Sequence, residues 1–506
     1  MTLLLYVLVL VALALNAPAD VWDPGSRAFI VIIGGIGLWR YAWGAVHFVR
    51  SIIYRKLVFP GWRRRADRLV AAEAAGVPGA RARVPEVFCI VTSYRIRAET
   101  TVAVYRALID NLIDYGQPAV IVASVVEAAD LRLVKQLFRK MNPPPTLRLA
   151  VVRLAGAGKR HALATSLRAV SRMGPLPESA VVVMDGDTVL APHTIARTLP
   201  FLRLMRRVGG LTTDEDCVVE GRRTIRTWHR LRFAQRHLLM SSLGLSRRLL
   251  AMTGRMSAFR AEIATNPSFI DMVANDALDH WRLGRLPLLT GEDKSTWLWL
   301  LERDWDMIYV PDVRVLTIEH PPSRSFFRAS TQLMLRWFGN MLRASGRAIS
   351  LGPARTGPFI WWCLIDQRVS MWTPLVGPVA TLMSAATHSL SILYIYLMWV
   401  MSTRLIQALS LLSVRDTISG LWPPLIYYNQ VYGALVKTWV LFRLDRQRWT
   451  RQNIALRQPM GAGQARLRAW GSAYLHGLAL VTLCGVLAFL AGILTFPPLA
   501  SLTRLF

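Results

Sequence analysis

The chain has 506 residues, of which 53% are hydrophobic, and a formal net charge of +30. Apolar runs lie near both ends, whereas arginines gather in the middle and in the connecting loops, which is typical of a membrane protein with a basic cytoplasmic face. The layout argues against a nucleic-acid-binding protein, because the basic clusters flank apolar spans and no nucleic-acid-binding motif appears. The four cysteines lie far apart without metal-ligand spacing, so we expect reduced and mostly buried thiols.

The amino-terminal region predicts two transmembrane helices within residues 1–54. Residues 1–16 are apolar and uncharged, and a second apolar run follows over 28–54, interrupted by Arg40 and His47. A signal peptide is the alternative for the first run, but a basic leading segment is missing and a second run follows closely. The arginines and lysines after the second run predict a basic cytoplasmic linker over 55–84.

Residues 85–345 contain no uninterrupted run of about 20 apolar residues, which predicts a cytoplasmic domain. Strand-like and helix-like segments alternate in its first half. The strands are expected at 87–92, 119–124, 147–154 and 180–184, and the helices at 98–114, 128–141 and 160–171. Alternation of this kind predicts a mostly parallel, doubly wound α/β sheet.

Residues 203–260 mix arginines with apolar residues. The segment is compatible with a solvated basic helix or with an amphipathic helix that lies on an anionic membrane surface. The sequence alone leaves both interpretations open.

The carboxy-terminal region is again membranous. Residues 346–370 predict an interfacial helix, because Trp361 and Trp362 are typical of the lipid headgroup level. We expect three or four transmembrane helices over 371–506, with spans at 371–402, 421–442 and 471–495 and a basic cytoplasmic loop over 443–470. The run 371–402 could be one long tilted span or two short ones.

Two carboxylates follow the apolar strand 181–184. Residues i and i+2 of an extended chain point to the same side, so Asp185 and Asp187 can converge at the carboxyl edge of the sheet, where open α/β sheets bind ligands. Two such oxygen donors suit Mg²⁺ or Mn²⁺ held together with substrate phosphates. The pattern is weak by itself, since a capped turn after a strand would look the same.

A glycine-containing turn carries Lys159 and Arg160 at the start of a predicted helix. The helix dipole and the free N–H groups of a helix start favour phosphate binding there. The spacing is not that of a P-loop. A basic surface turn is the alternative.

Two further motifs can carry chemistry. Glu292 and Asp293 precede an apolar helix, where Asp293 could be a general base or could cap the helix. Arg336 and Trp337 could supply a cation for a diphosphate and an aromatic face for a sugar ring. Alternatively, they belong to a core helix with one snorkelling arginine.

The order of these motifs, bracketed by apolar spans, resembles the processive family 2 glycosyltransferases, the group of cellulose, chitin and hyaluronan synthases. The resemblance covers roughly residues 85–340 and the membrane layout at both ends. It implies an α/β glycosyltransferase A-type domain inserted between all-α transmembrane segments. It also implies inverting sugar transfer and a polymer that is threaded through the membrane spans as it grows.

The same resemblance implies roles for individual residues. It assigns metal binding to Asp185 and Asp187, and the role of catalytic base to Asp293 with Glu292 beside it. It assigns nucleotide and diphosphate binding to Lys159, Arg160, Arg336, Thr92 and Glu127, with Asp130 as a weaker candidate. It assigns acceptor binding to Trp337, Gly254 and Glu319, and a gating loop over the donor to Trp449 and Arg451. An interfacial anchor is the alternative for that loop. The segment 124–127 lacks the family's base-reading aspartate, which leaves the donor base open.

Within this group, the segments TGEDKSTWLWLLERDWDMIYVPDV and LMLRWFGNMLR resemble those of mannuronan synthases, the alginate polymerases of Gram-negative bacteria. This resemblance implies GDP-mannuronic acid as donor and a β-1,4-linked polymannuronate product. It further implies a multi-pass inner-membrane location among lipids and a separate cyclic-di-GMP-binding co-polymerase as partner. The alternatives are a synthase that uses a UDP-sugar, a non-processive lipid glycosyltransferase and a non-enzymatic membrane scaffold.

Overall fold

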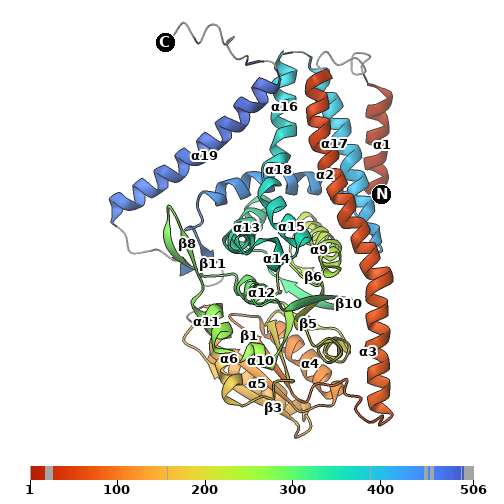
Figure 1. Cartoon of the computed structure of the whole chain (residues 1–506), viewed down its shortest axis with the longest axis vertical. Coiled ribbons are helices and arrows are strands. Elements are labelled where there is room, and N and C mark those ends of the chain that lie inside the picture. The colour runs from red at the N-terminus through yellow and green to blue at the C-terminus, as the bar shows by residue number, and fades with distance from the viewer. Residues whose placement is uncertain are drawn as a thin grey trace. The chain divides into compact units, whose positions relative to one another are not determined.

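The computed structural model of the chain describes residues 2–17, 27–156, 158–387, 389–449, 454–455, 461–491 and 493–494. It divides into two compact units (Figure 1). The first comprises Met1–Val46, Asp366–Leu444 and Gln458–Phe506, and the second comprises His47–Ile365 and Asp445–Arg457. Each unit is described by itself.

The first unit is helical. Its elements are α1 (Thr2–Leu15), the first part of α2 (Arg27–Ile53), α16 (Thr373–Thr387), α17 (Ser391–Ser410), the 3₁₀ turn η3 (Leu411–Ser413), α18 (Trp422–Leu441) and α19 (Ala462–Leu490). The predicted span 371–402 therefore falls on two helices, α16 and α17. Among the described residues, three segments are long and apolar enough to cross a membrane: Pro358–Thr387, Ser391–Ser413 and Ala462–Leu490.

Ionisable side chains of the first unit face partners inside it. Arg40 of α2 pairs with Asp366, and Arg404 of α17 donates a hydrogen bond to the Tyr41 hydroxyl. Charged groups are costly in a bilayer and usually pair with protein groups there. The number of spans and the side of each loop remain predictions.

The second unit is built around an eight-stranded sheet in the order β3-β2-β1-β4-β7-β6-β10-β5. The strands are β1 (Val87–Thr92), β2 (Ala119–Val125), β3 (Leu147–Arg153), β4 (Ala180–Asp185), β5 (Thr188–Leu190), β6 (Val208–Val219), β7 (Met256–Arg260) and β10 (Asp306–Glu319). Strands β3, β2, β1 and β4 are mutually parallel, and β6 is parallel to β10. Strand β7 is antiparallel to β4 and β6, and β5 is antiparallel to β10. The predicted α/β fold is confirmed, with a mixed sheet in which the four strands β3, β2, β1 and β4 are parallel as predicted.

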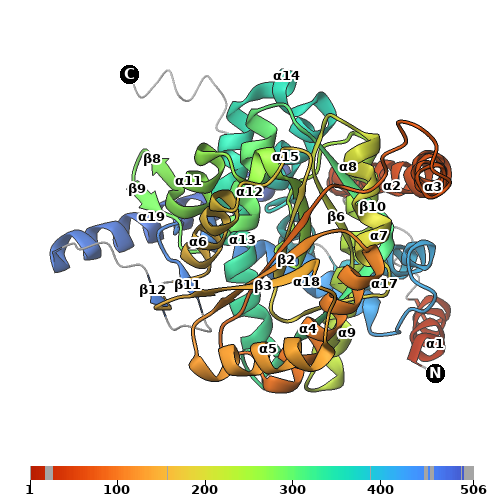
Figure 2. The same cartoon turned by 90° about the horizontal axis from the view of Figure 1, so that it is seen from below.

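Helices cover both faces of this sheet. Figure 2 shows α4 (Ala98–Tyr115) and α5 (Ala128–Met141) on one side of β2 and β3, with α6 (Lys159–Arg172) and α11 (Pro267–Asn275) on the other. The chain order reverses between β1 and β4, which neighbour each other in the sheet. Open α/β sheets bind ligands at such a switch point, beyond the carboxyl ends of the strands.

The remaining elements complete the second unit. They are α3 (Phe59–Ala74), α7 (Thr194–Thr198), α8 (Pro200–Leu204), α9 (Arg223–Gly244), α10 (Ala261–Ala264), the hairpin of β8 (Ala277–His280) and β9 (Gly284–Pro287), α12 (Glu292–Glu302), α13 (Phe326–Ser350), α14 (Gly352–Thr356), most of α15 (Pro358–Val369) and the short strands β11 (Arg448–Trp449) and β12 (Ile454–Ala455).

The four cysteines of the chain are free thiols, as predicted. Three of them are buried and the fourth is half-buried.

The structure adds detail to two expectations for this unit. Helix α9 is not a fully solvated helix, because much of it is buried against β6 and β10, with Trp228 fully enclosed. The first part of the predicted linker over 55–84 is helical, because α2 continues through a π-helical turn (Tyr54–Val58) into α3. The buried Tyr54 hydroxyl donates to the Tyr309 carbonyl at 2.5 Å, which fixes this segment to the sheet.

Candidate active site

The predicted Asp-Gly-Asp motif lies at the carboxyl edge of the sheet, beside the end of β1. Asp185 is the last residue of β4 and is in register with Thr92 of β1. Gly186 N donates to Thr92 O at 2.9 Å, and a Cβ on Gly186 would collide with Ser93 Oγ. Only glycine allows the chain to pass β1 this closely. The buried Asp187 follows, and its carbonyl accepts from Ile318 N of β10 at 2.9 Å.

Lys159 connects three motifs that are far apart in sequence. It is the first residue of α6, and its Nζ lies 2.6 Å from Asp185 Oδ1 and 2.5 Å from Glu292 Oε1. The third motif is the turn at Gly254, where a Cβ would lie 2.7 Å from Lys159 Nζ and 3.3 Å from Asp185 Oδ2. These residues therefore form one cluster at the switch point of the sheet.

Glu292 and Asp293 occupy the first turn of α12. The residue that caps this helix is Gly291, with φ +91°, so the alternative in which Asp293 serves as the cap is wrong. Carboxylates in a first helical turn are favoured by the helix dipole. The Asp293 carbonyl accepts a hydrogen bond from Thr296 Oγ1 at 3.1 Å, and Asp293 lines a cavity together with Lys159, Gly254 and Glu292.

The two neighbouring carboxylates have pKa values that are pushed apart. Burial by itself would raise the pKa of Glu292, but Lys159 outweighs it and holds this pKa at about 2. Burial and the adjacent Glu292 raise the pKa of Asp293. Burial alone would lower the pKa of Lys159, but Asp185 and Glu292 raise it. Paired carboxylates with opposite shifts are typical of sites that divide structural and acid–base roles, and the raised pKa suits Asp293 to accept a proton.

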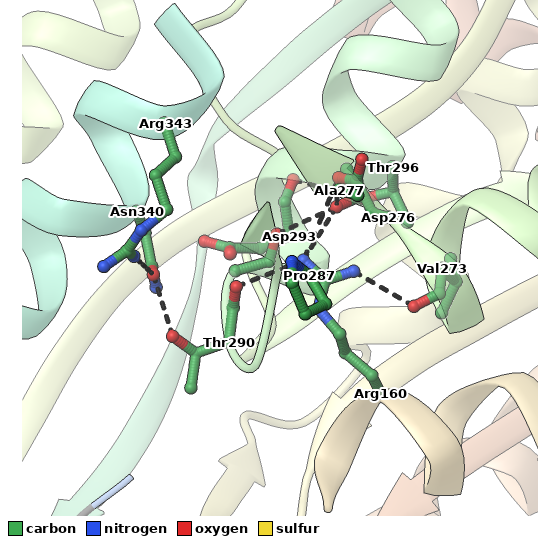
Figure 3. Close-up of polar contacts among 12 residues, drawn as sticks. Arg160, Val273, Asp276, Ala277, Pro287, Thr290, Asp293, Thr296, Asn340 and Arg343 are labelled. Carbon is green, nitrogen blue, oxygen red and sulfur yellow. Dashed lines mark hydrogen bonds and ion pairs between the residues drawn. The ribbon is translucent and has the colours of Figure 1, made fainter. Parts of the chain in front are cut away.

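Arg160 has different partners from those predicted. Its buried guanidinium donates to Val273 O at 3.0 Å, to Thr290 O at 3.1 Å and to Ser295 Oγ at 2.9 Å. Figure 3 shows this side chain directed toward α11 and the turn before α12. Arg160 therefore braces that turn, and its contact with a diphosphate stays a prediction.

Helix α13 also holds the turn that carries the two carboxylates. Thr290 Oγ1 donates to Asn340 Oδ1 at 2.8 Å, and Arg343 Nη1 donates to the same oxygen at 3.1 Å (Figure 3). A Cβ on Gly291 would lie 3.1 Å from Asn340 Cγ. Asn340 was not predicted as a site residue, although it lies one turn after Trp337 on the same helix.

Gln447 is a second residue near the site that was not predicted from the sequence. Its Oε1 accepts from Leu289 N at 3.0 Å and its Nε2 donates to Pro287 O at 2.9 Å. It directly precedes β11, which contains Trp449 and pairs with β12. The predicted gating residue Arg451 lies outside the described residues. The base of the predicted gating loop is therefore fixed to the segment that leads into Thr290.

The predicted acceptor residues lie around a second charged cluster. Glu319, at the end of β10, has its Oε1 2.8 Å from Arg255 Nη2, and Arg255 Nη1 lies 3.2 Å from Glu215 Oε2. Burial would raise the pKa of Glu319, but Arg255 holds it at about 2, with a smaller contribution from Arg336. Trp337 of α13 stacks on Trp228 of α9, with ring centroids 5.8 Å apart.

The predicted nucleotide side combines two buried hydroxyls with one exposed carboxylate. The Thr92 hydroxyl is buried at the end of β1 and, within the part of the chain that is described, has no hydrogen-bond partner. The same holds for Ser124 at the neighbouring end of β2. Glu127 caps α5 and is exposed, with its Oε1 4.0 Å from Arg95 Nε. Buried hydroxyls without partners are typical of positions that a ligand completes.

The donor set around Asp185 fits a divalent cation that shares its ligands with a substrate. Asp185 and Asp187 offer carboxylate oxygens, and no group of three or more His, Cys, Asp or Glu residues that could hold a metal ion by itself is present among the described residues. Mg²⁺ is usually held by one or two carboxylates together with substrate phosphates and waters. The ammonium of Lys159 beside Asp185 shows that this position accommodates positive charge.

The substitution Gly254→Ala tests how tightly Lys159 and Asp185 pack against the turn at Gly254. The added methyl group requires Lys159 Nζ to leave its place between Asp185 and Glu292, whereas no backbone atom stands in the way. We expect at least a roughly tenfold loss of activity, about 1.4 kcal/mol of transition-state free energy, together with a lower melting temperature, because the displaced ammonium no longer pairs with the buried Glu292. Gly61→Ala on α3, where a Cβ meets nothing within 4 Å, is the matched control. Full activity of Gly254→Ala would contradict this geometry.

Known proteins resemble this chain over most of its length. The family described as "Glycosyltransferase like family 2" matches residues 85–340. Two proteins named Glycosyltransferase alg8 match as well: that of Pseudomonas syringae pv. tomato is 45% identical over 469 residues and that of Azotobacter vinelandii is 44% identical over 470 residues, with 93% of both chains covered in each case. Among solved structures, a mannosyltransferase from Pyrobaculum calidifontis in complex with GDP-mannose and Mn²⁺ aligns with 80% of this chain and 98% of its own, at 18% identity and a TM-score of 0.42. The chain thus belongs to the family 2 glycosyltransferases.

Proposed function

We propose that this glycosyltransferase polymerises mannuronic acid from GDP-mannuronate into β-1,4-linked polymannuronate, the precursor of alginate. The relatives named alg8 support an alginate-related enzyme, since they match 93% of the chain at 44–45% identity. The observation that carries the catalytic part is the cluster in which Lys159 holds Asp185 and Glu292 beside Asp293.

In the proposed reaction, the terminal hydroxyl of the acceptor attacks the anomeric carbon of the donor sugar from the face opposite the diphosphate. A new C–O glycosidic bond forms while the bond from the anomeric carbon to the phosphate oxygen breaks, so GDP leaves with that electron pair. The Asp293 carboxylate accepts the hydroxyl proton. The raised pKa of Asp293 suits this role, because a catalytic base works best when its pKa lies closer to the operating pH.

The other residues position and neutralise charge. A divalent cation, Mg²⁺ or Mn²⁺, held by Asp185 and Asp187 would offset the charge of the leaving diphosphate. Lys159 Nζ is placed to exchange one of its carboxylate partners for a phosphate oxygen, and Arg336, which acts on Glu319, is the second cation assigned to the diphosphate. Trp337 offers an aromatic face to the acceptor sugar.

The membrane part of the proposal follows from the first unit. Its candidate spans suit a multi-pass protein of the bacterial inner membrane, with the second unit in the cytoplasm and the polymer passed outward as it grows. The proposed partners are the nucleotide-sugar donor, the anionic polymer, membrane lipids and a separate cyclic-di-GMP-binding co-polymerase.

Donor competition tests the proposed substrate. Membranes that contain the full-length protein are incubated with labelled GDP-mannuronate, and unlabelled GDP or UDP is added. We expect GDP to inhibit incorporation and UDP to have little effect. Inhibition by UDP alone, or incorporation from a UDP-sugar, would favour a synthase of another polysaccharide.

The pH dependence of the rate tests the role of Asp293. A base must be ionised to act, so the rate is expected to fall as the pH drops through the pKa of Asp293. Because that pKa is raised, the midpoint of the acid limb should lie above the ordinary aspartate value of about 3.9. The profile of kcat between pH 4 and 8 measures it, and a rate that is constant down to an ordinary aspartate pKa would contradict the assignment.

A further inference from the structure

Arg232 of α9 is held against two tryptophan rings. Its guanidinium carbon lies 3.8 Å from the ring centroid of Trp337 and 5.0 Å from that of Trp228. The two indoles stack on each other with an interplanar angle of 25°. A guanidinium against aromatic faces is stabilised by cation–π attraction while its N–H donors stay available.

No carboxylate of the described residues pairs with Arg232. The acids around it are already taken, since Glu215 and Glu319 pair with Arg255 and Glu215 also lies 3.3 Å from Arg236. Burial and the nearby Arg255 lower the pKa of Arg232 to about 9, which keeps it charged at neutral pH. A half-buried cation without a counter-charge is unfavourable unless an anion joins it.

This cation lies on the acceptor side of the candidate active site. Arg255 directly follows Gly254, whose Cβ position is 3.3 Å from Asp185, and Arg255 pairs with Glu319 at the end of β10. Arg232 in turn contacts Trp337, the predicted acceptor residue. Arg255 also lies 5.0 Å from the ring centroid of Phe233, the residue next to Arg232 on α9, which places Arg232 near the catalytic cluster within the second unit.

We propose that Arg232 is a specificity-determining residue that binds the carboxylate of a uronic acid at the acceptor end of the growing polymer. This inference rests on the proposed function and names the group that recognises its anionic product. Arginine presents a fork of donors that matches a carboxylate, and the adjacent indole of Trp337 suits the apolar face of a pyranose ring. A synthase of a neutral polysaccharide would have no use for a cation at this place.

The test compares an anionic ligand with a neutral one on the full-length protein purified in detergent. Isothermal titration measures the affinity for a β-1,4-linked oligomannuronate and for a β-1,4-linked manno-oligosaccharide of equal length. Arg232→Gln should weaken oligomannuronate binding by about 10–100-fold, as expected for the loss of hydrogen bonds to a charged group, and leave the neutral ligand unaffected. Arg232→Lys should restore part of the affinity, because it keeps the charge but loses the fork.

The matched control is Arg230→Gln. Arg230 is exposed and lies two residues away, on the opposite side of α9. The Arg230→Gln protein should bind both ligands with the affinity of the unmodified protein. Equal oligomannuronate affinity of Arg232→Gln and Arg230→Gln, with melting profiles unchanged, would overturn the inference.

Kinetics separate the acceptor from the donor as the source of the carboxylate. If Arg232 binds the acceptor, Arg232→Gln lowers oligomannuronate affinity and leaves the KM for GDP-mannuronate within about twofold. A raised KM for GDP-mannuronate with unchanged oligomannuronate affinity would contradict the acceptor assignment. Failure of the unmodified protein to use GDP-mannuronate would instead refute the proposed function, so the two failures can be told apart.

Discussion

Replacing Asp293 with asparagine should lower the polymerisation rate by about 10²–10⁴-fold while the amount of protein in the membrane stays unchanged. Asparagine has the same shape but cannot accept the proton of the attacking hydroxyl. The Thr296 hydroxyl contacts the Asp293 carbonyl rather than its side chain, so this local hydrogen bond is retained. The measurement is the initial rate of sugar incorporation from labelled donor.

The control for this variant is Asp279→Asn on β8. Asp279 is an exposed carboxylate of the same unit, and its loss should leave the rate unchanged. Donor binding by Asp293→Asn should also be preserved, because the residue is not assigned to the nucleotide. Normal polymer yield from Asp293→Asn would remove it from the role of base.

Replacing Lys159 with methionine should cost both activity and stability. Methionine keeps the length of the side chain but leaves Asp185 and the buried Glu292 without their shared cation. Removing one partner of a buried ion pair typically costs about 3–5 kcal/mol. We therefore expect a clearly lower melting temperature of the purified protein and a rate close to background.

The double variant Lys159→Met/Glu292→Gln separates the two effects. Neutralising Glu292 removes the uncompensated buried charge, so a large part of the lost stability should return. The activity should not return, because the cation assigned to the diphosphate is still missing. Equal melting temperatures of Lys159→Met and the unmodified protein would show that Lys159 does not hold this cluster together.

The first half of the sheet could be predicted because its strands are nearly continuous apolar runs, as expected for parallel strands that are covered on both faces. Strand β6 could not, because it buries Asp214 and Glu215. Those carboxylates are compensated by Arg314 and Arg255, which lie 100 and 40 residues further along the chain. Such pairings exist only after folding, so the segment looks too polar for a central strand.

Partners from distant parts of the chain also explain why the burial of α9 could not be predicted. Its arginines predicted a helix in water or on a membrane surface, but several of them are enclosed with aromatic rings and acids from other elements. Arg232 lies against Trp337 of α13, and Arg236 pairs with Glu215 of β6. The sequence shows the charge but not the partner that makes its burial possible.

The order of motifs predicted which residues gather in the site, whereas their contacts depend on side-chain direction. Successive residues of a helix point about 100° apart. Lys159 therefore reaches Asp185, while the adjacent Arg160 turns toward Thr290 and Ser295. The two residues are adjacent in sequence and were predicted to act as a pair, but their side chains contact different groups.

Analysis of the product tests the central claim most directly. The purified full-length protein is incubated with labelled GDP-mannuronate and Mg²⁺ or Mn²⁺, and the polymer is digested with a lyase specific for mannuronate. We expect a long labelled polymer that the lyase degrades completely and that Asp293→Asn does not make. A polymer that resists the lyase, or one made only from a UDP-sugar, would contradict the account.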